Sequence, residues 1–342
     1  MITAVNLSKS FVGRSGRVVG IEDVTLDIPA GSVYGVLGPA GSGKSTLARL
    51  FALEDRPDSG VIRLDGHNTA TLDSRRLRDA RRSIAVLPGG DSLLARRTVA
   101  GNIALPLEQA GVDGPTRRIR VGRVLDLVGL TERAGQLPEA LSPGQRRRVA
   151  VARALVGEPS VLLADEPTAD LDAAGAAGVL AALDRVRGEL GATVVVATAD
   201  SGVVRRVAES VAVLHQGRLT ESGHLLSLLQ DPTSAAAAAL LPSVDTPDPA
   251  RLAAHRLVAE VVLVGFASVG ALLPEAASRF GVDIPVLGGG LTRVGEVPVA
   301  RFLIGVRAAA GSADRASAAL SWLAERGASV GPWSAPVVAA AA

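Results

Sequence analysis

The stretch GPAGSGKST, residues 38–46, decides the fold class of this chain. It fits the phosphate-loop pattern G-x-x-x-x-G-K-[ST]. The apolar run 33–37 predicts a strand that enters the loop, and residues 46–52 predict a helix that leaves it. Glycines let the backbone curl so that successive N–H groups face a phosphate at the positive end of that helix. An ordinary glycine-rich turn is the alternative, and the order of strand, loop and helix argues against it.

The loop predicts a nucleotide site, and a second motif supports it. We expect Lys44 to reach the β- and γ-phosphates and the Ser45 hydroxyl to ligate Mg²⁺. The segment VLLADEP, residues 161–167, is an apolar strand that ends in two carboxylates. Asp165 is expected to hold Mg²⁺ through water, and Glu166 to act as the catalytic base that orients and deprotonates the attacking water. A buried strand capped by acidic turn residues is the alternative. The predicted loop contacts to nucleotide are Gly38, Pro39, Ala40, Gly41, Ser42, Gly43, Lys44, Ser45 and Thr46.

Composition narrows the class of protein. The formal net charge of +2 gives no field strong enough to indicate a nucleic-acid partner, so we interpret the arginine clusters as solvated helix faces. The absence of cysteine excludes disulfides and thiolate chemistry. The N-terminus lacks a signal-peptide pattern, and the longest apolar run, 261–274, is too short for a bilayer. We therefore expect a soluble, cytoplasmic protein that is free to dock on a membrane protein.

The order of expected elements predicts an α/β fold with a second, α+β domain. Short β-like runs within residues 1–35, including separate strands at 18–21 and 24–28, predict a small antiparallel sheet. Apolar runs that alternate with helical stretches predict a parallel sheet, with strands at 161–164, 193–197 and 211–214. The last part has the order β-α-β-β-α-β of a ferredoxin-like sandwich. The predicted domains are 1–230, with a helical subdomain at about 90–155, then a linker rich in Pro, Ala, Ser and Asp at 231–250, then 251–335.

One segment ties these motifs to a known family. LSPGQRRRVAVARAL, residues 141–155, resembles the signature segment of ATP-binding cassette (ABC) ATPases, usually LSGGQ followed by a basic helix. The triplet Asp170-Leu171-Asp172 follows the second motif as that family's D-loop does, and Phe11 stands where the family stacks an aromatic ring on adenine. The resemblance implies that two copies sandwich two ATP molecules. The positions that it places on the partner's ATP are Ser142, Gly144 and Gln145.

Within ABC ATPases, the chain most resembles the ATPases of methionine importers. The segments LLARRTVAGNIALPLEQAGV and LDLVGL are similar to that subfamily. The C-terminal segment RFGVDIPVLGGGLTRVGEVPVARFLIGV resembles its regulatory NIL, or ACT-like, domain. The resemblance implies a peripheral subunit on the cytoplasmic face of the cell membrane, where ATP-Mg²⁺ drives amino-acid uptake through a permease. It also implies that the C-terminal domains pair and sense an amino acid, methionine.

The chain departs from the family pattern around the γ-phosphate. Gly89 stands where the family has its Q-loop glutamine, and Ala199 where it has its switch histidine. Pro143 replaces the first glycine of LSGGQ, and proline has no backbone N–H. Losses of this kind predict slow hydrolysis with nucleotide affinity retained, unless a partner supplies the groups. In the C-terminal domain, Gly290 stands where the family has a polar residue that faces the ligand.

Three functions remain open from the sequence. The first is an importer ATPase, and the second is a nucleotide-binding subunit of low turnover, such as the silent half of a heterodimer or a regulator. Lineage drift with compensation nearby is the alternative reading of the departures. The third, a soluble ABC protein of DNA repair or translation, is disfavoured because the chain has one cassette and no basic nucleic-acid surface. The solute, the permease and homo- versus heterodimer are not specified by the sequence.

Overall fold

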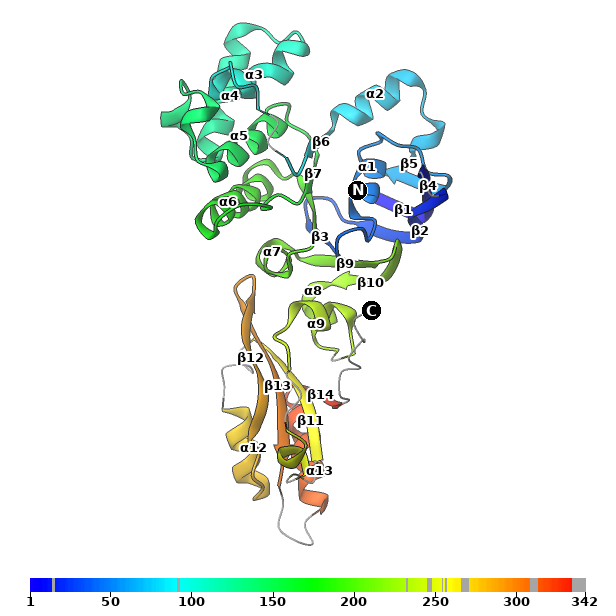
Figure 1. The fold of residues 1–342 in the computed structure, drawn as a ribbon, viewed down its shortest axis with the longest axis vertical. Coiled ribbons are helices and arrows are strands. Elements are labelled where there is room, and N and C mark those ends of the chain that lie inside the picture. Colours follow the sequence, from blue (N-terminus) through cyan, green and yellow to red (C-terminus); the bar gives the residue numbers. More distant parts are fainter. Residues whose placement is uncertain are drawn as a thin grey trace. The chain divides into compact units, whose positions relative to one another are not determined.

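The computed structural model describes the chain except for residues 14–15, 91–92, 232, 245–247, 254, 256, 266–270, 308–312 and 334–342. The chain divides into two compact units, Met1–Ser222 and Gly223–Ala342. Figure 1 shows the helices and strands of both units. Among the described residues, no helix combines the length and the apolar character needed to cross a membrane.

A six-stranded sheet forms the centre of the first unit, and its strands β3, β6, β7, β8 and β9 pair in parallel. Strands β3 and β8 are buried along their whole lengths, as expected for parallel strands covered on both faces. This confirms the predicted α/β class. The strands in spatial order are β10 (Arg218–His224), β9 (Ser210–His215), β3 (Val33–Leu37), β8 (Thr193–Thr198), β7 (Val161–Asp165) and β6 (Ile84–Leu87).

Two antiparallel strands precede the phosphate loop, as predicted, and two strands that follow the loop complete a four-stranded sheet. Its strands in spatial order are β2 (Gly16–Ile28), β1 (Ile2–Gly13), β4 (Ser59–Leu64) and β5 (His67–Asn68). The prediction of separate strands at 18–21 and 24–28 is wrong, because β2 runs through both. The β1–β2 pairing shifts register between Leu7 and Lys9, and Asp23 takes a positive φ of 51°. An irregularity of this kind lets one strand continue past residues that resemble a turn.

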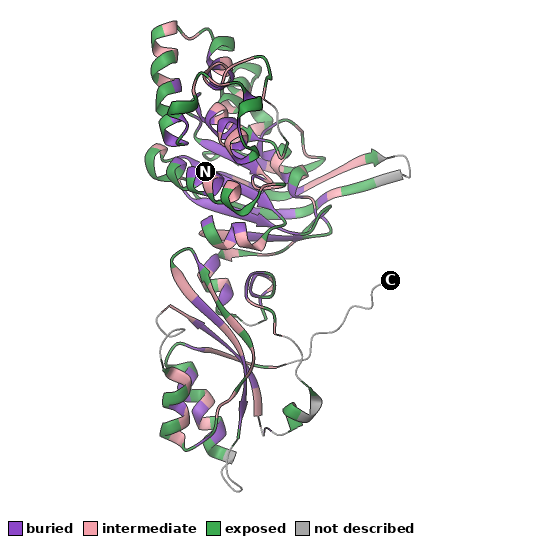
Figure 2. Cartoon of the chain, turned by 60° about the vertical axis from the view of Figure 1, so that its left-hand side comes forward, coloured by how far each residue is buried: buried purple, intermediate pink, exposed green. Residues whose placement is uncertain are grey.

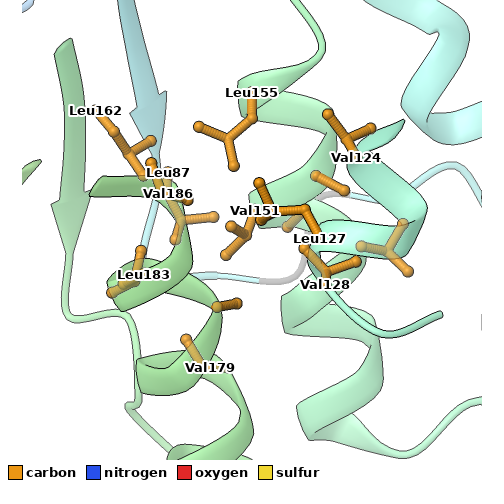
Figure 3. Packing of buried hydrophobic residues seen from close by; sticks show 14 of the residues in the cluster. Leu87, Val124, Leu127, Val128, Val151, Leu155, Leu162, Val179, Leu183 and Val186 are labelled. Carbon is orange, nitrogen blue, oxygen red and sulfur yellow. The ribbon is translucent and has the colours of Figure 1, made fainter. Parts of the chain in front are cut away.

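Helices cover the parallel sheet and form most of the segment 90–155. They are α1 (Lys44–Phe51), α2 (Ser74–Arg82), α3 (Val99–Gln109), α4 (Gly114–Leu127), α5 (Pro143–Leu155), α6 (Ala173–Leu190) and α7 (Ser201–Val207), with short 3-10 turns at Thr69–Thr71, Thr131–Arg133 and Pro138–Ala140. One face of the sheet packs with α3 to α6 in a core that includes Leu155 and Leu162, shown in Figure 3. The other face packs against α1 and the antiparallel sheet.

The second unit contains an α+β sandwich in the predicted order. All pairings in its sheet, β12-β13-β11-β14, are antiparallel. Residues Val261, Ile304 and Leu323 lie in its core, and Figure 2 shows the buried residues along these strands. The elements are β11 (Leu257–Val264), α12 (Leu272–Phe280), β12 (Val286–Val294), β13 (Val297–Val306), α13 (Ala313–Glu325) and β14 (Ser329–Pro332).

The segment predicted as a linker, 231–250, contains helix α9 (Ala235–Leu240). Ser234 caps this helix by accepting a hydrogen bond from the Ala237 N–H, and Leu240 is fully buried. Alanine has the highest helix propensity, so a run that suggests low complexity also favours a helix once one face is buried. Parts of the predicted linker and the end of the domain at 335 lie outside the described residues. The unit also contains α8 (Leu225–Leu229) and α10 (Pro249–Ala253).

Candidate nucleotide site

The phosphate loop connects β3 to α1 with its glycines in demanding positions. Gly43 precedes α1 with φ 102°, and a Cβ there would lie 2.4 Å from the Gly20 carbonyl oxygen, so no other residue fits. No side chain caps the N-terminus of α1 in the described structure, which leaves its first N–H groups and the positive end of its dipole for an anion. Ser45, in the first turn, is exposed. The loop therefore has the form that its sequence predicted.

Lys44 lies at the centre of the site and is almost fully buried. Its Nζ donates to the carbonyl oxygens of Gly38, at 2.8 Å, and Pro39, at 3.0 Å. The same Nζ lies 3.6 Å from Oε1 of Glu166, which joins the loop to the end of β7. The cation therefore stands between the phosphate loop and the acidic motif, where it can neutralise a phosphate.

Two buried oxygens at this site have no hydrogen-bond partner among the described residues, Ser42 Oγ and Asp165 Oδ1. Unsatisfied buried oxygens are rare because losing water without a partner costs about 1–3 kcal/mol each. They fit a site that is completed by ATP and Mg²⁺, with Ser45 and Asp165 as the side chains that would hold the cation. Among the described residues, no cluster of three His, Asp or Glu side chains forms a cage for a metal. A cation here would thus depend on the phosphates, which is usual for Mg²⁺.

Glu166 is oriented by the end of β8. Its Oε2 accepts a hydrogen bond from Thr198 Oγ1 at 2.8 Å, and its Oε1 accepts one from the Ala199 N–H at 3.0 Å. Its backbone has a positive φ of 44°, and its N–H donates to the Ala197 carbonyl oxygen at 2.8 Å. These contacts hold the carboxylate in one orientation beside Lys44. Sequence reasoning missed Thr198, because nothing in the strand pattern ties its hydroxyl to a residue 32 positions earlier.

Phe11 lies next to the first turn of α1. A Cβ at Gly20 would lie 2.9 Å from both the Phe11 ring and the Thr46 methyl group. These two side chains therefore lie close to the position that a larger residue at 20 would occupy. The cations of Lys9 and Arg49 lie 5.8 and 5.9 Å from the ring centroid. A half-exposed ring beside the loop is available for stacking on a base.

The signature segment begins α5 and faces a different pocket. Ser142 caps the helix in a reciprocal capping box with Gln145, and Pro143 occupies the first helical position, where its missing N–H costs nothing to the helix. Gly144 packs closely on Gly175 of α6. Together with Asp170 and Asp172 of the D-loop, these residues line a pocket of about 450 Å³ that includes no residue of the phosphate loop. The structure does not bring them to Lys44 within one chain.

Two of the departures from the family pattern, Gly89 and Ala199, lie beside Asp165 and Glu166. A Cβ added at Gly89 would lie 3.4 Å from the Asp165 carbonyl oxygen and 3.8 Å from Glu166 Cβ. Ala199 is exposed at the end of β8 and gives Glu166 its backbone N–H alone. The loop that contains Gly89 is held instead by Arg147 of α5, which sequence reasoning treated only as part of a solvated basic helix. Arg147 is buried, so that interpretation is wrong for this residue.

Comparisons with known proteins agree with this geometry. Residues 21–169 match the ABC transporter family model, and residues 257–331 match the NIL domain. The chain is 40% identical over 326 residues to the methionine import ATP-binding protein of Thermobifida fusca, covering 95% of this chain and 98% of that one. It is 42% identical over 311 residues to methionine import ATP-binding protein 1 of Rhodococcus jostii, covering 90% of each.

Solved structures of ABC cassettes share the fold of the first unit. A dimeric ATP-binding cassette in a post-hydrolysis state, bound to ADP and Pi, matches with a TM-score of 0.59 and 32% identity over 66% of this chain and 98% of that one. A Clostridium perfringens protein that is part of an ABC transporter complex matches with a TM-score of 0.60 and 29% identity over 65% of this chain and 88% of that one.

The phosphate loop, the paired carboxylates and the signature helix on this sheet define an ATPase of the ATP-binding cassette class. The chain belongs to the methionine import ATP-binding protein family of ABC transporters. The predicted family, fold class and ATPase activity are confirmed. The roles assigned to individual site residues stay predictions.

Proposed function

We propose that this protein is the ATP-binding subunit of an importer for methionine or a similar amino acid. The observation that carries the proposal is that identity to methionine import proteins extends over 95% of the chain, through both the cassette and the C-terminal unit. The convergence of Lys44, Asp165 and Glu166 supports the ATP-binding part of it. The subunit would lie on the cytoplasmic face of the cell membrane, against a permease.

In this proposal the site residues act by position and charge. Lys44 and the N–H groups of the loop bind the β- and γ-phosphates, while Ser45 and Asp165 hold Mg²⁺, which supplies charge neutralisation at those phosphates when bound. Glu166, held by Thr198, orients the attacking water and accepts a proton from it. Phe11 stacks on adenine. Ser142, Gly144 and Gln145 complete the ATP site of a second ATP-binding subunit, so the protein works as a dimer.

Turnover is proposed to be slow. Gly89 offers no side chain toward the carboxylates, and Ala199 offers no donor beyond its backbone. Pro143 removes one N–H that the family's glycine would present to the partner's ATP. None of these changes touches the loop 38–46, so ATP affinity is retained. This favours, as a second candidate, a subunit of low turnover in a complex where another chain performs most of the hydrolysis.

An amino acid is proposed as a ligand of the second unit by resemblance to the family alone. Gly290 lies within strand β12, where segment 287–290 has no polar side chain, and a Cβ at Gly290 would lie 3.5 Å from the Pro242 side chain. Equilibrium dialysis of the full protein with labelled methionine tests this part. Saturable binding of methionine supports a sensor role for the second unit. Methionine binding no stronger than alanine binding contradicts that role.

Transport is tested by reconstituting the protein with the permease subunit of a methionine importer in vesicles that contain ATP-Mg²⁺. Uptake of labelled methionine should exceed that of alanine and should be abolished by Lys44→Ala. Failure of the protein to bind the permease, or uptake that is independent of Lys44, would contradict the proposal. ATP turnover measured in the same vesicles separates the two candidates.

A further inference from the structure

Arg147, in the first turns of α5, donates hydrogen bonds to the loop of residues 88–90, outside its own helix. The guanidinium Nη1 donates to the carbonyl oxygens of Pro88, at 2.6 Å, and Gly90, at 3.1 Å. Nη2 donates to the carbonyl oxygen between them, that of Gly89. The residue is only 8% exposed, so these hydrogen bonds are largely shielded from water. Three successive carbonyls turned to one side chain fix the direction of the backbone that carries them.

The geometry suits arginine alone. A guanidinium presents five N–H donors in a rigid planar fork, so it can serve three acceptors at once. A glutamine amide has two donors, and a lysine ammonium is a compact cation without the fork. The clasped loop contains two successive glycines, which have no side chains of their own to anchor them. The loop therefore relies on Arg147 for its conformation.

The same loop also lies beside Asp165 and Glu166 at the end of β7. The position of a Cβ on Gly89 is 3.4 Å from the Asp165 carbonyl oxygen and 3.8 Å from Glu166 Cβ. The loop is thus placed between Arg147 and the end of β7. Beside it, Gly90, Pro143 and Asp170 contribute to a pocket of about 290 Å³, which brings the loop, the start of the signature helix and the D-loop together.

We propose that Arg147 is a positioning residue for ATP hydrolysis, which fixes the backbone of residues 88–90 against Asp165 and Glu166. The proposal rests on the ATPase function of this site. The hydrogen bonds from Arg147 make the backbone of residues 88–90 rigid at the position where Gly89 supplies no side chain. Arg147 acts through the loop, by its hydrogen bonds to the carbonyl oxygens of residues 88–90. Its removal should lower kcat and leave ATP affinity unchanged, because the loop 38–46 is untouched.

The test uses the absence of cysteine from the chain. A single Gly90→Cys substitution fits, because no atom of the described residues, apart from its chain neighbours, lies within 4 Å of a Cβ there. The cysteine can carry a spin label that reports loop motion. Gly188→Cys, also open and located on α6, carries the control label. Each background receives Arg147→Gln, Arg147→Lys or Arg148→Gln. Arg148 is the matched control, since it donates to the Val128 carbonyl oxygen from the same helix at 2.9 Å.

Arg147→Gln should release the label at residue 90, seen as loss of its immobilised spectral component, and leave the label at residue 188 unchanged. In chains without labels, Arg147→Gln should lower kcat on the order of 10- to 100-fold, the usual effect of a small misplacement near reacting groups, with the Kd for ATP unchanged. Arg147→Lys should fall between Gln and wild type, and Arg148→Gln should leave the label at residue 90 immobilised.

Three results would overturn the proposal. The label at residue 90 could stay immobilised in Arg147→Gln, or both labels could loosen together, which would indicate a general loss of structure. Equal kcat in wild type and Arg147→Gln would also refute the positioning role. The spectra are recorded without nucleotide. If the wild type failed to bind ATP, the proposed function would be contradicted, but the spectra would still measure whether Arg147 holds the loop.

Discussion

Replacing Ala199 with histidine should speed ATP hydrolysis. Ala199 is exposed at the end of β8, so a larger side chain meets no packed core. Its backbone N–H already holds Glu166 Oε1 at 3.0 Å, and the substitution keeps that bond. The added imidazole would place one donor beside the γ-phosphate. The prediction therefore concerns a gain of function from one added donor, with Gly89 and Pro143 left as they are.

The size of the gain follows from the strength of one hydrogen bond to a charged group. Such a bond contributes about 1.5–3 kcal/mol. Each 1.36 kcal/mol removed from the barrier is a factor of ten in rate. A donor that acts only in the transition state should therefore raise kcat roughly 10- to 150-fold and leave the Kd for ATP nearly constant.

The assay is phosphate release at saturating ATP-Mg²⁺ by the protein assembled with its permease, with ATP binding measured on the same samples. Ala199→Leu is the matched control, because it adds bulk without a donor and should give no gain. Glu166→Gln combined with Ala199→His should be inactive. Equal turnover by wild type and Ala199→His, with ATP bound normally, would refute the reasoning that the missing donor limits the rate.

Three further predictions concern contacts described above. Thr198→Val removes the hydroxyl that donates to Glu166 at 2.8 Å and should lower kcat about tenfold or more, with Thr198→Ser near wild type in the same phosphate assay. Leu155→Ala, at a fully buried position, should lower the free energy of unfolding by about 2–5 kcal/mol in urea titrations, and a loss below 1 kcal/mol would contradict the packing. Burial raises the pKa of Tyr34, the single tyrosine, to about 12. Its phenol should therefore ionise near pH 12 in the native protein and near pH 10 in urea, and absorbance spectroscopy measures the ionisation. The stability that the protonated phenol contributes is complete below pH 10 and is lost as the pH rises through 12.

Motifs with fixed spacing could be predicted from the sequence, because a phosphate loop must curl the same way wherever it binds phosphate. The apolar runs at 161–164 and 193–197 likewise indicated buried parallel strands, since such strands have two covered faces. The continuous β2 could not be predicted, because a bulge and a turn use the same residue types. The contacts of Thr198 and Arg147 join residues far apart in the chain. The pairing of β7 with β8 brings Thr198 to Glu166, and the packing of α5 against the loop after β6 brings Arg147 to residues 88–90.

The measurement that tests the central claim most directly follows the nucleotide bound by the unmodified protein. Wild type, Glu166→Gln and Lys44→Ala are each mixed with labelled ATP-Mg²⁺, and the bound ATP and ADP are separated over time. We predict that wild type retains mostly ATP, close to Glu166→Gln, and that Lys44→Ala retains almost none. If wild type converts its bound ATP to ADP quickly while Glu166→Gln preserves it, the claim that this site binds ATP tightly and hydrolyses it slowly is contradicted.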